Sequence, residues 1–179
     1  MKRFYRSLLQ CLLVATILVA GTACPSYAAK KYTLESALQE TADLIAAEQL
    51  IPANANIAVV GFVESTTRAR WPLSSTLEDD LSSFLITKRP GKVIAKNHID
   101  TVLRELRITR DDLFDSQKRK QFGKLASADL LVSGTYWVNR QTVIINITVV
   151  NIENGLGLFA HRVKVRKSEF AKYILNYAK

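Results

Sequence analysis

The sequence predicts an α/β (α+β) protein. We expect a mixed sheet of about five strands, in which a β-α-β-α unit is followed by a three-strand antiparallel meander, with helices packed on the sheet. In the first half, apolar residues at helical spacing separate two short apolar runs, at residues 56–65 and 92–95, an order that calls for a right-handed crossover and parallel pairing. From Asp129 onward, β-branched and aromatic residues dominate three runs joined by short turns.

The first 28 residues have the layout of a secretory signal peptide. Three basic residues precede an apolar segment, Leu8–Ala20, and small residues with a proline follow it. Since that segment is short for a membrane span, export is favoured over an uncleaved anchor helix. Cleavage after Ala28 would leave residues 29–179 as one domain, whereas the segment ending at Cys24 resembles a lipobox and offers lipidation of that cysteine as the alternative.

Composition limits the classes of function. The leader holds both cysteines and three of the 25 basic residues, so the rest of the chain has a formal charge of about +6 and no thiol if cleavage follows Ala28. A disulfide scaffold and a thiolate metal site are then excluded. The charge is too mild to indicate nucleic-acid binding, and an anionic membrane or cell-wall surface is the more natural partner.

Helices are expected between the strands of the first half. Residues 33–50 form an amphipathic pattern with Thr33 as N-cap, and a capping box from Ser75 to Glu78 starts a second helix. Asn97 is expected to cap the third helix and Ser116 a fourth. The side chains that should face the core in these helices are Leu34, Leu38, Ala42, Ile45, Leu77, Leu81, Phe84, Leu85, Ile99, Val102, Leu103, Leu106, Phe122, Leu125 and Ala126.

Turn residues divide the second half. Asn139–Gln141 separates the first two runs of the meander, and Asn154-Gly155 separates the second from the third. The chain closes with residues 167–179 as a short amphipathic helix or a frayed tail.

Asp129 opens the apolar run that follows the fourth helix. A carboxylate at that place can be a catalytic acid, a metal ligand or a turn residue that satisfies backbone donors. Only two histidines, His98 and His161, are available as partners, and no spacing typical of a zinc or glycosidase site occurs. Glycines and serines form no phosphate loop or nucleophile elbow. The sequence therefore predicts a structural role for Asp129, no cofactor, and no enzyme.

Two surface features remain as candidate interfaces. Arg162, Lys164 and Arg166 alternate with apolar residues, which predicts a basic face on one strand; it is either a charged edge that discourages aggregation or a binding patch. In the segment 64–73, Arg68, Arg70 and Trp71 have the composition of an interface hot spot, although Trp71 could equally fill the core.

Several segments together resemble a known domain. "ANIAVVGFVES", "GKVIAKNHIDTVLREL", "FGKLASADLLVSGTYW" and "ITVVNIENGLGLFA", in that order, resemble the domain shared by bacterial envelope proteins related to FlgO and CsgG. The resemblance runs from about Leu34 to Val165. Before the helix at "IDTVLREL", where the family carries an acidic-basic pair, this chain has Ala95 and Lys96.

The resemblance implies an exported, non-catalytic protein of a Gram-negative-type envelope that docks to other proteins at or near the outer membrane. An accessory role in a surface organelle such as the flagellum is the first expectation, and oligomerisation is compatible with it. Activation of a penicillin-binding protein, as by lipoproteins with a similar domain, and a curli-type secretion role are the alternatives.

Overall fold

A five-stranded mixed sheet forms the centre of the molecule, with the order β2-β1-β3-β4-β5. The computed structural model describes residues 33–67, 69–70, 72–88 and 91–177, all within one compact unit. The predicted leader, Cys24, Arg68 and Trp71 lie outside these residues. The strands are β1 (Asn56–Glu64), β2 (Lys92–Val93), β3 (Leu130–Val138), β4 (Thr142–Asn151) and β5 (Gly157–Arg166).

Strand pairing follows the predicted change of topology. β1 pairs in parallel with β2 and β3, whereas β3, β4 and β5 form an antiparallel meander. The hairpin turns fall at the predicted places, and Gly155 adopts a positive φ of 75° in the second. The predicted second strand, residues 92–95, is shorter than expected and has two residues.

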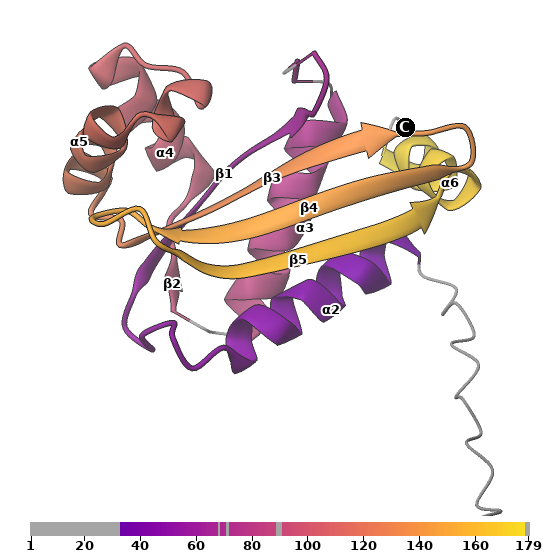
Figure 1. Cartoon of the computed structure of the whole chain (residues 1–179), viewed down its shortest axis with the longest axis horizontal. Helices are drawn as coiled ribbons and strands as arrows, with labels where there is room; N and C mark the ends of the chain where they lie inside the picture. Colours follow the sequence, from indigo (N-terminus) through magenta and orange to yellow (C-terminus); the bar gives the residue numbers. More distant parts are fainter. Residues whose placement is uncertain (1–32, 68, 71, 89–90, 178–179) are drawn as a thin grey trace, which may run out of the picture. The chain divides into compact units, whose positions relative to one another are not determined.

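In the described ranges, six helical segments accompany the sheet. They are α2 (Leu34–Ala47), α3 (Pro72–Lys88), α4 (Lys96–Leu106), the 3₁₀ helix η1 (Asp111–Phe114), α5 (Ser116–Ala126) and α6 (Lys167–Tyr177). Figure 1 shows α3 crossing behind the long strands, α2 running below β5 in this view, and α4 and α5 grouped at one end of the sheet.

Three of the predicted helix starts are wrong. α3 begins at Pro72, so Ser75 lies inside the helix and forms no capping box. Ala95 rather than Asn97 is the N-cap of α4, and Asp115 rather than Ser116 caps α5, accepting from the amides of Gln117 and Lys118. Thr33 caps α2 as predicted. The two caps differ in kind, since Ala95 makes no side-chain hydrogen bond to its helix whereas Asp115 does, so the start of α4 does not depend on a capping side chain.

Two cores lie on opposite faces of the sheet. The larger one joins α2, α3 and Phe170 of α6 to the inner face of β1, β3, β4 and β5. The smaller one joins α4, η1 and α5 to the other face of β1 and the beginning of β3, through Ala58, Val60 and Leu131. The prediction that Leu125 faces the core is wrong, since this side chain is 45% exposed. In α5, Gly123 instead lies against Ile152.

Candidate functional site: a buried ion cluster and an uncovered sheet face

Asp129 has a structural role. Its Oδ2 accepts a hydrogen bond of 2.8 Å from the amide of Asn56, while its own amide donates to the carbonyl of Asn56 at 2.9 Å. Asp129 thus joins the starts of two parallel strands that are 73 residues apart in the chain. The predicted satisfaction of a backbone donor at a strand entry is confirmed, but the donor belongs to β1 rather than to a local turn.

Asp129 and His161 are not brought together. The carbonyl of Asp129 accepts from Ile152, just past the end of β4, whereas His161 lies opposite Ile147, so the two positions are five residues apart along this part of the chain. At 3.4 Å per residue this is about 17 Å along the strand. His161 instead contacts helix α2, where its Nδ1 lies 3.0 Å from Thr41 Oγ1. The two groups cannot act on one substrate atom.

A hollow of about 540 Å³ borders Asp129. Its other charged side chains are Lys120, Lys124 and Glu153, of which Lys120 and Glu153 form an ion pair at 3.1 Å. Within the described residues, no group of three or more histidine, cysteine, aspartate or glutamate side chains is arranged to hold a metal ion.

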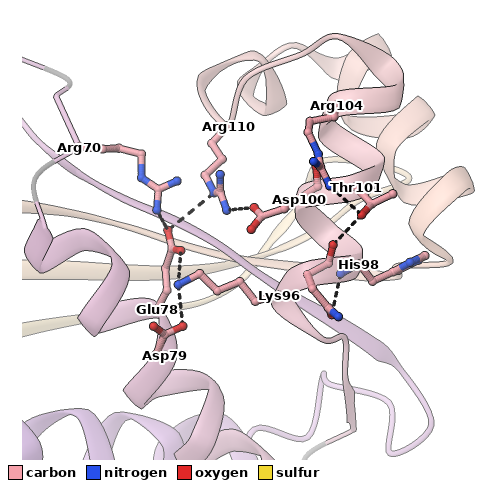
Figure 2. A network of polar contacts seen from close by, with 10 residues as sticks. Arg70, Glu78, Asp79, Lys96, His98, Asp100, Thr101, Arg104 and Arg110 are labelled. Carbon is pink, nitrogen blue, oxygen red and sulfur yellow. Dashed lines mark hydrogen bonds and ion pairs between the residues drawn. The ribbon is translucent and has the colours of Figure 1, made fainter.

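A buried ion cluster lies where α3, α4 and the segment before η1 meet, and Figure 2 shows it. Glu78 is 1% exposed, and its Oε1 accepts from Arg70 at 2.6 Å and lies 3.8 Å from Arg110 Nε. Lys96 Nζ is 3.9 Å from the other oxygen of Glu78 and 2.7 Å from Asp79. Three cations therefore surround one buried carboxylate, which offsets the cost of its burial.

The cluster fixes two chain segments. Arg110, which also pairs with Asp100, holds the approach to η1 against α3. Arg70, a predicted interface residue, donates from its guanidinium to Glu78, and 31% of its side chain is exposed, so this residue contributes to the fold. Sequence reasoning missed the role of Glu78 because it was assigned to a helix cap.

Hydrogen bonding also lowers two carboxyl pKa values. Backbone and side-chain donors of Thr67 and Thr66 lower the pKa of Glu64 to about 2. A hydrogen bond from Lys118, with further ones from Thr109, lowers the pKa of Asp112 to about 2, and the same Asp112 contact raises the pKa of Lys118. Both carboxylates order loops: Glu64 closes the turn after β1, and Asp112 closes the turn before η1.

The remaining feature is the outer face of β3, β4 and β5, the face that α2 and α3 do not cover. Only the edge of this face near Leu131 lies under the second core. Cross-strand rows on it follow from the register, and they consist of Trp137–Ile144–Lys164, Thr135–Asn146–Arg162, Ser133–Thr148–Ala160 and Thr142–Arg166. None of these side chains is acidic.

The predicted basic stripe, Arg162, Lys164 and Arg166, lies on this outer face. All three residues are exposed, whereas Val163 and Val165 between them are buried in the inner core, as the alternation predicted. Arg162 Nε donates to Asn146 Oδ1 at 2.7 Å, so a neighbouring strand orients one of the three cations. A hollow of about 640 Å³ continues the stripe and is lined in part by Arg140, Arg166 and Lys167.

Trp137 is the interface candidate that sequence reasoning missed. It is 47% exposed and stands beside Ile144 and in the row of Lys164. The sequence did not give its neighbours, because a three-residue turn at 139–141 would set Trp137 opposite Val143, whereas in the structure Trp137 lies opposite Ile144. Aromatic residues and arginines are the types enriched at protein interfaces.

A family model matches residues 37–137, more than half of the chain; it describes the curli production assembly/transport component CsgG. The chain belongs to the CsgG family. The matched residues include the ion cluster and Trp137 and end before β4, so the basic stripe lies outside the match. No curated protein sequence matches the chain.

Several solved structures share the fold of this CsgG-family chain. The C-terminal domain of LpoB from Salmonella enterica superposes with a TM-score of 0.63 at 12% identity, over 75% of this chain and 98% of that domain. The corresponding domain from Escherichia coli gives 0.61 at 12% identity, with the same coverage. Lipoprotein GNA1162 from Neisseria meningitidis gives 0.50 at 14% identity, over 69% of this chain and 96% of that one. At these identities the likeness concerns the fold.

No helix in the described ranges has the length and apolar character needed to cross a membrane.

Proposed function

We propose that this CsgG-family chain is a non-catalytic envelope protein that acts by binding other proteins at or near the outer membrane. Family membership supports the envelope setting. The observation that carries the non-catalytic part is the separation of Asp129 and His161, each occupied by a contact that the fold needs. Asp129 and His161 are thus used for structure, and we assign contact with partners to the outer face of β3–β5.

Activation of a cell-wall synthase is the partner role that the fold favours. The domain of LpoB is matched over 98% of its length, so this chain has the elements of that domain almost entirely. The flagellar accessory role, which rests on the resemblance to FlgO, stays as a second candidate function. A curli-type secretion role is the third.

Gene deletion in the source bacterium separates these roles. Loss of swimming with normal cell-wall synthesis would support the organelle role, whereas sensitivity to β-lactams with normal swimming would support the synthase role. Cross-linking of the protein in intact cells, followed by identification of the linked partner, should then recover flagellar basal-body proteins in one case and a transglycosylase–transpeptidase in the other.

An enzymatic assay tests the non-catalytic part. If the purified protein turned over a small substrate, and turnover disappeared on replacing Asp129 or His161 while folding was retained, the proposal would be overturned.

A further inference from the structure

Among the described residues, no strand pairs with one of the two backbone edges of β5. β5 is the last strand of the sheet, and β4 is its only neighbour within the part of the chain that the structure describes. The amide of Lys167 donates to the carbonyl of Gln141, which fixes the hydrogen-bonded pairs at alternate positions, 143/165, 145/163 and 147/161. The backbone groups of Arg162 and Lys164, and of Arg166 at the strand end, therefore point away from β4.

The side chains of the same three residues share the outer face. Alternate residues of a strand are about 6.7 Å apart, so the three cations form a row with that spacing along the free edge. None of the side chains in the adjoining rows of the outer face is acidic, and no carboxylate of the described residues forms an ion pair with Lys164 or Arg166. A strand added at this edge would place the Cβ atoms of its own outer side chains about 5 Å from the Cβ atoms of these three residues.

This arrangement disfavours a second copy of the chain as the added strand. Antiparallel pairing of two β5 strands would set arginine and lysine opposite arginine and lysine, which is destabilising. The other strands of the chain do not supply complementary charge either, since β3 and β4 contain no acidic residue and β1 only its terminal Glu64. Charge repulsion at this edge thus disfavours pairing with a second β5 strand, while the backbone groups of the edge can still pair with a segment of opposite charge.

We propose that β5 binds an extended acidic segment of a partner protein as a sixth strand, with carboxylates at alternate positions facing Arg162, Lys164 and Arg166. Backbone hydrogen bonds to the edge supply affinity, and the row of charges selects the partner and its register. This inference rests on the proposed function, because it specifies how the envelope protein contacts its partner. It also unites the two alternatives for the stripe: the same charges prevent self-pairing and select a partner.

Synthetic peptides test the geometry. A labelled ten-residue peptide that alternates glutamate and threonine should bind the purified protein, measured by fluorescence anisotropy at low salt. A peptide of the same composition with the glutamates in one block should bind at least about tenfold more weakly, because it cannot place a carboxylate opposite each cation. N-methylation of the amides on the pairing side of the alternating peptide should cause a similar loss, because it removes the backbone donors.

A charge swap tests the residues. The variant R162E/K164E/R166E should lose the acidic peptide and gain an alternating lysine–threonine peptide, while K92E/R104E/K124E, which has the same net charge with its changes elsewhere on the surface, should bind the acidic peptide as the wild type does. Circular dichroism melting of both variants confirms folding. A third variant, R162T/K164T/R166T, should dimerise in sedimentation experiments, since it removes the repulsion from a free edge.

Equal binding of the alternating, block and N-methylated peptides would overturn strand addition in favour of general anion binding. Binding of the protein to anionic phosphatidylglycerol vesicles would do the same if the charge-swap variant lost vesicle binding as it loses peptide binding. Absence of peptide binding would also overturn it. If the protein still cross-linked to its envelope partner in that case, only this inference would fail and the proposed function would stand; turnover of a substrate would instead remove the proposed function.

Discussion

The inner and outer faces of strands β3–β5 contrast although the same residues build both. On the inner face, β4 contributes Val143, Ile145, Ile147 and Val149, all fully buried. On the outer face, the same strand contributes threonine, asparagine and Ile144, and β5 contributes three exposed cations. The inner face has the composition of a domain core and the outer one that of a contact surface. Within each strand, substitutions of inner residues should therefore affect stability, and substitutions of outer residues should affect binding.

Replacement of an inner isoleucine should have the largest effect. Ile147→Ala removes a fully buried side chain from the main core and should lower the free energy of unfolding by about 2–5 kcal/mol. Ile144→Ala is the matched control on the outer face of the same strand, where we expect a loss of about 1 kcal/mol or less. Urea denaturation measures both, and equal losses would contradict the contrast.

The inner face should also resist an added methyl group. A Cβ at Gly134 would lie 2.3 Å from Cε1 of Phe62 and 2.8 Å from the carbonyl oxygen of Asn146. Gly134→Ala should therefore cost about 1–3 kcal/mol through displacement of Phe62. Gly157→Ala, at a position with open space around the added atom, should leave the denaturation midpoint close to that of the wild type. A harmless Gly134→Ala change would show that the Phe62 ring can move aside.

A smaller effect is expected where the two parallel strands begin. Asp129→Ala removes the acceptor of the Asn56 amide and should cost about 1 kcal/mol. Asp129→Asn keeps an oxygen acceptor and should recover most of that loss. Thermal denaturation of the two variants provides the measurement; a fully stable Asp129→Ala would argue against the structural role.

The charge of the Glu64 carboxylate should make stability depend on pH only in the acidic range. Its pKa is lowered from 4.5 to about 2 in the folded chain, so the folded state binds its proton less readily than the unfolded state does. The contribution of this carboxylate is present above pH 4.5 and is lost as the pH falls from 4.5 through 2. Denaturation midpoints measured across that range should fall less steeply for Glu64→Gln than for the wild type. Parallel slopes would show that the turn at Thr66 and Thr67 does not depend on the charge.

The predictability of the fold varied with the kind of signal. Where one pattern had one physical solution, as in the alternation of β5 or the helical spacing of Leu34, Leu38 and Ile45, the prediction is confirmed. At two helix starts, where Asn97 and Ser116 were predicted as caps, the prediction is wrong by two residues and by one residue, respectively. Leu125 failed because the close approach of α5 to Ile152 turns Gly123 toward the sheet.

The candidate site was less accessible to sequence reasoning. Arg162, Lys164 and Arg166 were identified from alternation alone, but the free backbone edge beside them depends on strand order, which the sequence leaves open. The partners of Glu78 come from three separate segments, and only folding brings Arg70, Lys96 and Arg110 to one carboxylate. The predicted leader, Arg68 and Trp71 stay predictions.

By itself, the sequence determined the fold class, the succession of helices and strands, and which side chains of each strand face the core, because these follow from local periodicity and turn chemistry. Tertiary structure alone decided that Asp129 joins β1 to β3, that Glu78 is buried among three cations, and that β5 ends the sheet with its basic face outward. Those features depend on contacts between residues far apart in the chain, and a local sequence pattern does not specify which distant segment a residue will contact.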